Sequence, residues 1–178
     1  MAKPKTTALL VLAAVALDPR HDAQRWWFVA ALVFCLAGDV FLMLPGDRFV
    51  AGLASFLFGH LLFMVGFFAG PGDDNPWILT VVLASNAIAL SARPVLRGAS
   101  QQDQRLRLPV ITYMFVIAAM LATSARTGNV FAIAGAAMFV ISDTILARHR
   151  FVAPWVRGRL ATMVTYHAAI GLLVVSLV

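Results

Sequence analysis

The sequence predicts an all-α protein, a polytopic membrane helix bundle with seven transmembrane helices that form a single domain over residues 1–178. Its 178 residues are 61% hydrophobic and only 12% charged, about half the charged fraction of a typical soluble domain, and the mean hydropathy is +0.87. The apolar stretches are long, and apolar and polar residues do not alternate within them as they do in the strands of a membrane β-barrel. Helices are therefore expected, because they satisfy all of their backbone hydrogen bonds within lipid.

Seven apolar stretches come close to the roughly 20 residues that cross a bilayer. The first is short and follows two lysines, so a secretory signal peptide is the alternative to a retained span there. The longest connection, residues 93–107, is expected to be a solvated basic loop rather than a helix along the membrane surface. The predicted spans are residues 6–17, 26–44, 49–70, 77–92, 108–125, 127–147 and 160–178.

The basic residues predict the orientation of these spans. The net charge is +6, and 11 of the 14 lysines and arginines fall on the side of the N-terminus when seven spans are counted. By the positive-inside rule, the protein lies in the cell membrane with its N-terminus in the cytoplasm and its C-terminus outside. The positive charge thus reports orientation, and no nucleic-acid partner is expected. The single cysteine, Cys35, excludes an intramolecular disulfide and a cysteine-rich metal site.

Two aspartates lie inside predicted spans. All eight acidic residues are Asp, and only Asp39 and Asp143 fall outside the connections. A charged side chain at the centre of a membrane helix costs roughly 2.5 to 3.5 kcal/mol on insertion scales, so such residues usually face a bundle interior or a wet cavity. At a rise of about 1.5 Å per residue, both aspartates lie at a similar depth in the cytoplasmic half of the bilayer. We therefore expect them to share one site.

Other polar side chains fall in the same half of the bilayer. We expect His60, Tyr113 and His167 to line one cavity with the two aspartates, open towards the cytoplasmic leaflet, and Asn86 to lie nearer the midplane. Other interpretations remain open for these residues. The aspartates and histidines also suit structural pairing or a zinc site made by all four, and Tyr113 and Asn86 also suit hydrogen bonds that only join helices.

A weak internal repeat supports a shared site. Residues 38–42, Gly-Asp-x-x-Leu, are followed by Arg48-Phe49, and residues 142–146, Ser-Asp-x-x-Leu, are followed by Arg150-Phe151. A span that carries a histidine comes after each. Both copies run in the same direction, which predicts parallel repeats in a three-one-three layout, an arrangement known among transporters.

Two kinds of polar group in this pattern, carboxyl groups and guanidinium groups, suggest a catalytic role and a binding role. Two carboxyl groups at one depth, one neutral and one ionised, suit acid catalysis of a hydrolysis. Arginines at the level of the cytoplasmic headgroups either bind a lipid phosphate or anchor the helices. The arginines concerned are Arg48, Arg148 and Arg150.

Five short motifs occur along the chain in a fixed order. They are Lys3-Pro4 at the start of a span, Gly38-Asp39-x-x-Leu42-x-Leu44-Pro45, the stretch from Phe56 to Phe63, Phe139-x-x-Ser142-Asp143-x-x-Leu146, and Tyr166-His167. In their order and spacing, these motifs resemble those of the YhhN-like lysoplasmalogenase family of multi-span membrane proteins. The resemblance covers nearly the whole chain and implies about eight spans, one more than the count made above.

The resemblance implies hydrolysis of the vinyl ether bond of a lysoplasmalogen, an ether lysophospholipid, to a fatty aldehyde and a glycerophospho-headgroup, with no metal or organic cofactor. An enol ether is cleaved by protonating its β-carbon to an oxocarbenium ion that water captures. Asp39 and Asp143 are the expected acid and cation stabiliser, in either order. The competing interpretation is a transporter or binding protein for a small solute or a lipid, built on the parallel repeats. The expected supporting residues are His60, Asn86, Tyr113, Ser142 and His167.

Overall fold

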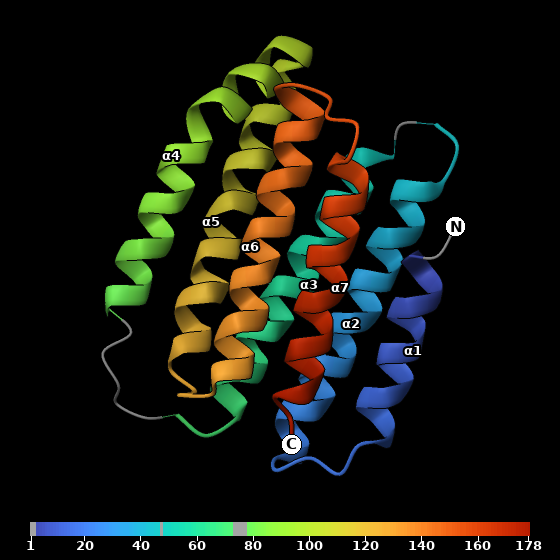
Figure 1. Ribbon diagram of the computed structural model, residues 1–178, viewed down its shortest axis with the longest axis vertical. Helices are drawn as coiled ribbons and strands as arrows, with labels where there is room; N and C mark the ends of the chain where they lie inside the picture. Colours follow the sequence, from blue (N-terminus) through green and yellow to red (C-terminus); the bar gives the residue numbers. More distant parts are fainter. Residues whose placement is uncertain (1–2, 47, 73–77) are drawn as a thin grey trace.

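The computed structural model describes residues 3–46, 48–72 and 78–178, and all regular structure in these ranges is helical (Figure 1). Each predicted span overlaps one α-helix, and the short 3-10 helix η1 precedes α5. The bounds are α1 Lys3–Ala16, α2 Asp22–Met43, α3 Phe49–Ala69, α4 Ile78–Gln102, η1 Gln104–Leu106, α5 Arg107–Ala125, α6 Val130–Phe151 and α7 Gly158–Val175.

Six of these helices, α2 to α7, are long and apolar enough to cross a membrane, as expected for a multi-pass membrane protein. Helix α1 has 14 residues, so it extends about 21 Å, less than the hydrocarbon thickness of roughly 30 Å. It nonetheless packs against α2 and α7, with Thr7 and Ala14 fully buried. The all-helical membrane fold is thus confirmed, and the seventh span depends on this short helix.

Two tight antiparallel pairs, α2 with α3 and α6 with α7, form the most extensive helix contacts. A Cβ at Gly59 would lie 3.2 Å from the carbonyl oxygen of Ala31, and one at Gly135 would lie 3.0 Å from that of Ala169. Small residues at such positions let membrane helices approach closely. Helix α5 packs against both α3 and α6 and so links the two pairs, while α1 and α4 lie at opposite edges of the bundle (Figure 1).

The expectation of a solvated loop at residues 93–107 is wrong. Helix α4 continues through Pro94 to Gln102, and η1 and α5 follow almost directly. A proline removes one helical hydrogen bond, but membrane helices tolerate this loss where neighbouring helices compensate. Here the continued helix buries Val95 and Ala99 in a small hydrophobic cluster with residues of α5 and α6. This burial explains why a basic segment that contains proline is helical.

The close approach of α4 to α6 can be tested at Gly98. A Cβ at this position would overlap the main-chain carbonyl oxygen of Phe151, which cannot turn away as a flexible side chain can. We expect Gly98→Ala to lower the free energy of unfolding by about 1 to 3 kcal/mol, in spite of the higher helix propensity of alanine. Thermal unfolding in detergent measures this. Gly171→Ala is the control, because a Cβ there meets nothing within 4 Å; equal melting temperatures for the two variants would contradict the packing.

Candidate functional site

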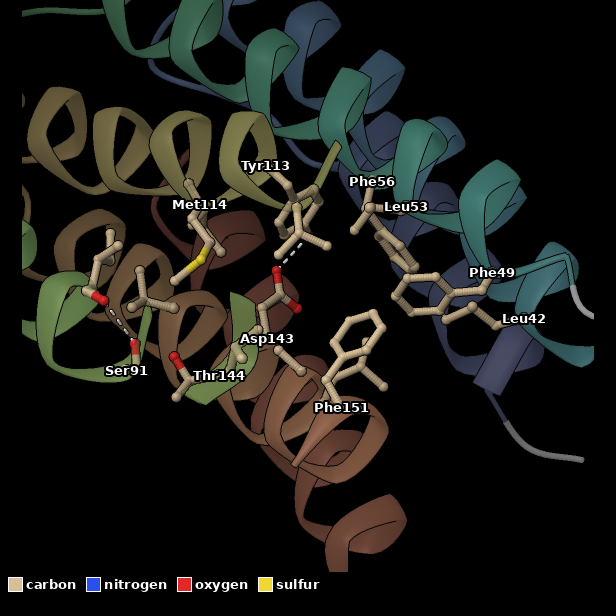
Figure 2. Close-up of a pocket in the computed structure, with 17 residues that line it drawn as sticks. Leu42, Phe49, Leu53, Phe56, Ser91, Tyr113, Met114, Asp143, Thr144 and Phe151 are labelled. Carbon is tan, nitrogen blue, oxygen red and sulfur yellow. Dashed lines mark hydrogen bonds between the residues drawn. The ribbon is translucent and has the colours of Figure 1, made fainter. Parts of the chain in front are cut away.

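An apolar pocket lies between α3, α4, α5 and α6. Only four of its lining side chains carry polar groups, namely Ser91, Tyr113, Asp143 and Thr144. Figure 2 shows the Asp143 carboxyl group among apolar and aromatic side chains. Among the described residues, the pocket therefore presents one carboxylic acid, Asp143, in apolar surroundings.

Side chains of two neighbouring helices lie next to the Asp143 carboxyl group. Asp143 lies on α6, and Tyr113 of α5 donates a hydrogen bond to its Oδ2 at 2.5 Å. The Nε2 atom of His60, on α3, lies 3.9 Å from the same oxygen, which is too far for a hydrogen bond. His60 is fully buried, with its ring edge-on to those of Tyr113 and Phe139 at centroid distances of 5.4 and 4.9 Å. His60 thus lies next to the carboxyl group but does not line the pocket.

Asp39, on α2, belongs to a second polar cluster outside the pocket. Its Oδ2 accepts hydrogen bonds from Thr7 of α1 at 2.7 Å and from Tyr166 of α7 at 3.0 Å. Asp39 is only 1% exposed. A buried carboxyl group is costly without hydrogen-bond donors, so these contacts hold α1 and α7 against α2.

An aromatic ring separates the two clusters. The ring of Phe139 packs against His60 at a centroid distance of 4.9 Å and against Tyr166 at 5.7 Å. The prediction of one cavity shared by both aspartates is therefore wrong, because Asp143 and its tyrosine line the pocket whereas Asp39 does not. The two carboxyl groups occupy neighbouring clusters instead.

Three residues predicted to support the site do not reach the pocket. Asn86 is exposed on α4 and donates at 2.8 Å to the carbonyl one turn earlier. Ser142 is buried and donates to the Thr162 carbonyl at 3.1 Å, which joins α6 to α7. His167 is half-buried, and its Nδ1 lies 2.8 Å from the carbonyl oxygen one turn earlier in α7. The sequence indicates how deep these residues lie but not the direction in which they point.

The three arginines predicted to bind phosphate lie at one end of the bundle. The guanidinium of Arg150 stands 5.1 Å from the ring centroid of Phe49, and Phe49 packs against Phe151 at 5.4 Å. Both phenyl rings line the pocket, so a cation adjoins this end of it. Arg48 and Arg148 are exposed where α3 begins and α6 ends.

The four-residue zinc grouping is not assembled, since no three His, Cys or Asp side chains of the described ranges lie close enough to hold one ion. Sequence reasoning did miss Thr7 and Tyr166 as partners of Asp39. Thr7 lies in the stretch that also suited a signal peptide, and Tyr166 was noted only beside His167. Successive residues of a helix point about 100° apart, so only one of that pair faces Asp39.

Comparison with known proteins bears on what this site does. The sequence profile of the YhhN family matches residues 1–177. The chain belongs to the YhhN family. No solved structure matches the chain.

Three relatives carry the name lysoplasmalogenase. The chain is 32% identical over 154 residues to lysoplasmalogenase TMEM86B of Mus musculus, 33% over 146 residues to that of Homo sapiens, and 28% over 158 residues to a lysoplasmalogenase of Mycobacterium tuberculosis. These alignments cover 86%, 82% and 83% of the chain, but 64%, 61% and 59% of the relatives. The chain thus spans less than two thirds of the length of these relatives.

The Asp39 cluster predicts a stability defect for Thr7→Val, which keeps the shape of the side chain but removes the hydroxyl donor. A buried acceptor that loses a donor costs about 1 to 3 kcal/mol, so the variant should unfold at a lower temperature in detergent. The matched control is Thr165→Val, because the Thr165 hydroxyl bonds only to carbonyls of its own helix. If both variants unfold at the same temperature as the wild type, the cluster does not hold α1 in place.

Proposed function

We propose that this protein hydrolyses the vinyl ether bond of lysoplasmalogen-type lysophospholipids and releases a fatty aldehyde and a glycerophospho-headgroup. Membership of the YhhN family and relatives named lysoplasmalogenase support this reaction. The observation that carries it is the Asp143 carboxyl group, which faces an apolar pocket between membrane-length helices. Such a pocket suits a substrate whose reactive bond adjoins a long apolar chain.

Asp143 supplies the proton in this proposal. Tyr113 donates to Oδ2, and in this proposal the acidic proton is on the other carboxyl oxygen, Oδ1. Transfer of that proton to the β-carbon of the enol ether produces an oxocarbenium ion beside the new carboxylate. The carboxylate stabilises the cation, and Tyr113 holds the carboxylate in place throughout. Tyr113 and His60 are thus positioning residues for the acid.

Asp39 acts without touching the substrate. Its carboxyl group lies in the cluster beyond the Phe139 ring, so it contributes to cation stabilisation only through space. Asn86, Ser142 and His167 support the site through their helices. Arg150 binds the headgroup phosphate by charge-assisted hydrogen bonds, together with Arg48 and Arg148.

We also propose that the parallel repeat is genuine, with α1 to α3 and α5 to α7 as the two copies and α4 between them. In each copy the first helix donates a hydroxyl hydrogen bond to the aspartate of the second, Thr7 to Asp39 and Tyr113 to Asp143. The third helix of each copy contacts the aspartate of the other copy. This correspondence of partners supports two related three-helix units.

The same topology makes α1 a seventh span, with the N-terminus in the cytoplasm and the C-terminus outside. A cysteine placed at Val178, in a Cys35→Ala background, should therefore react with an impermeant maleimide added to intact cells. The charge asymmetry is the physical reason, because basic residues are retained on the cytoplasmic side. Labelling that requires opening of the cells would contradict this topology.

The acid assignment predicts that Asp143→Asn, which keeps the shape but removes the proton, lowers turnover by about 10² or more, the usual scale of acid catalysis. Asp39→Asn, outside the pocket, should lower it by less than about tenfold. Aldehyde release from lysoplasmalogen by detergent-purified protein measures both. Asp18→Asn in the exposed α1–α2 connection is the control. Full specific activity in Asp143→Asn would refute the assignment.

A further inference from the structure

One hydroxyl group in the pocket has no structural partner. Among the described residues, Thr144 makes no hydrogen bond through its side chain, although it lines the pocket beside Asp143. Serine and threonine hydroxyls in helices commonly bond back to a carbonyl one turn earlier. Those of Thr162 and Thr165 do so in this protein. The Thr144 hydroxyl is therefore available to a ligand in the pocket.

A second hydroxyl group, that of Ser91, also lines the pocket. Ser91 of α4 donates to the carbonyls of Ala87 and Ile88, so its oxygen keeps lone pairs that accept hydrogen bonds. In the view of Figure 2, Thr144 lies between Ser91 and the Asp143 carboxyl group. Since a water molecule bound in an apolar site needs two to four polar partners, this is the part of the pocket best able to hold one.

We propose that Thr144, with Ser91, binds the water molecule that captures the oxocarbenium ion. This inference rests on the proposed function and adds to it a binding site for water, the second substrate of the hydrolysis. The Thr144 hydroxyl holds the water oxygen next to Asp143, where the cation forms. Without such a group, the apolar pocket has little to retain water between turnovers.

The steps balance with water as the only co-reactant. The π electrons of the enol ether form a bond from the β-carbon to the Asp143 carboxyl proton, and the O–H bond of the carboxyl group breaks. The positive charge that results is shared by the α-carbon and the ether oxygen. The water oxygen bonds to the α-carbon, and its proton returns to Asp143. The resulting hemiacetal loses its hydroxyl proton, the bond to the ether oxygen breaks, and that oxygen takes up a proton. The products are the aldehyde and the glycerophospho alcohol.

The test is competition between water and methanol for the cation. Methanol capture yields a mixed acetal, water capture yields the aldehyde, and mass spectrometry measures both products. At a fixed methanol concentration, we expect Thr144→Val to raise the acetal-to-aldehyde ratio at least threefold, because the residue that favours water is lost. Thr144→Ala should act in the same way, while Thr144→Ser, which keeps the hydroxyl, should restore the wild-type ratio. The ratio comes only from active molecules, so reduced folding does not affect it.

Thr165→Val is the matched control, since it removes a threonine hydroxyl outside the pocket. An unchanged ratio in both Thr144→Val and Thr144→Ala would refute the role of Thr144, as would an equal rise in Thr165→Val or in Thr144→Ser. Failure of the proposed function is a different result, because wild-type protein would then release no aldehyde from lysoplasmalogen in water alone.

Discussion

The bundle depends on the hydrogen bonds that two tyrosines donate to two aspartates, of which Asp39 is buried and Asp143 is partly buried. Tyr113 binds Asp143 between α5 and α6, and Tyr166 binds Asp39 between α7 and α2. Apolar side chains alone discriminate weakly among helix partners in lipid, because lipid tails are as apolar as leucine. A carboxyl group without a donor is costly in such surroundings. These polar contacts therefore specify which helices lie side by side, and the apolar residues fill the space that remains.

The aromatic residues near these contacts give the two carboxyl groups different exposure. Phe139 stands between His60 and Tyr166, and Phe56 packs against the other side of the Asp39 cluster at 5.8 Å from Tyr166. Asp143 lines the pocket whereas Asp39 does not, so in the proposed reaction Asp143 is the acid. The two aspartates look equivalent in sequence, yet their surroundings suit different tasks.

The sequence was sufficient for the features that depend on composition and on depth. Each predicted apolar stretch overlaps one of the seven α-helices, although α4 extends past its stretch to Gln102, and Tyr113 and His60 do lie beside Asp143. It was insufficient for rotation about the helix axis, since depth follows from counting residues but direction depends on which helices are neighbours. Asn86 therefore proved exposed. The proline and arginines near residue 94 pointed to a loop, because the burial of the extended α4 needs partners that only the tertiary structure supplies.

Helix α4 accounts for the remaining difference between the two aspartates. In the proposed repeat it belongs to neither copy, and it packs chiefly against α5 and α6, beside Asp143. Ile88, Ser91 and Val95 on its inner side form one wall of the pocket, and it is the least buried of the six long apolar helices. On the Asp39 side, α1 and α7 close directly on the carboxyl group. An added helix at one edge thus leaves a space next to one carboxyl group. Because α4 lies at the edge of the bundle (Figure 1) and is little buried, this one helix separates the pocket from the surroundings on that side.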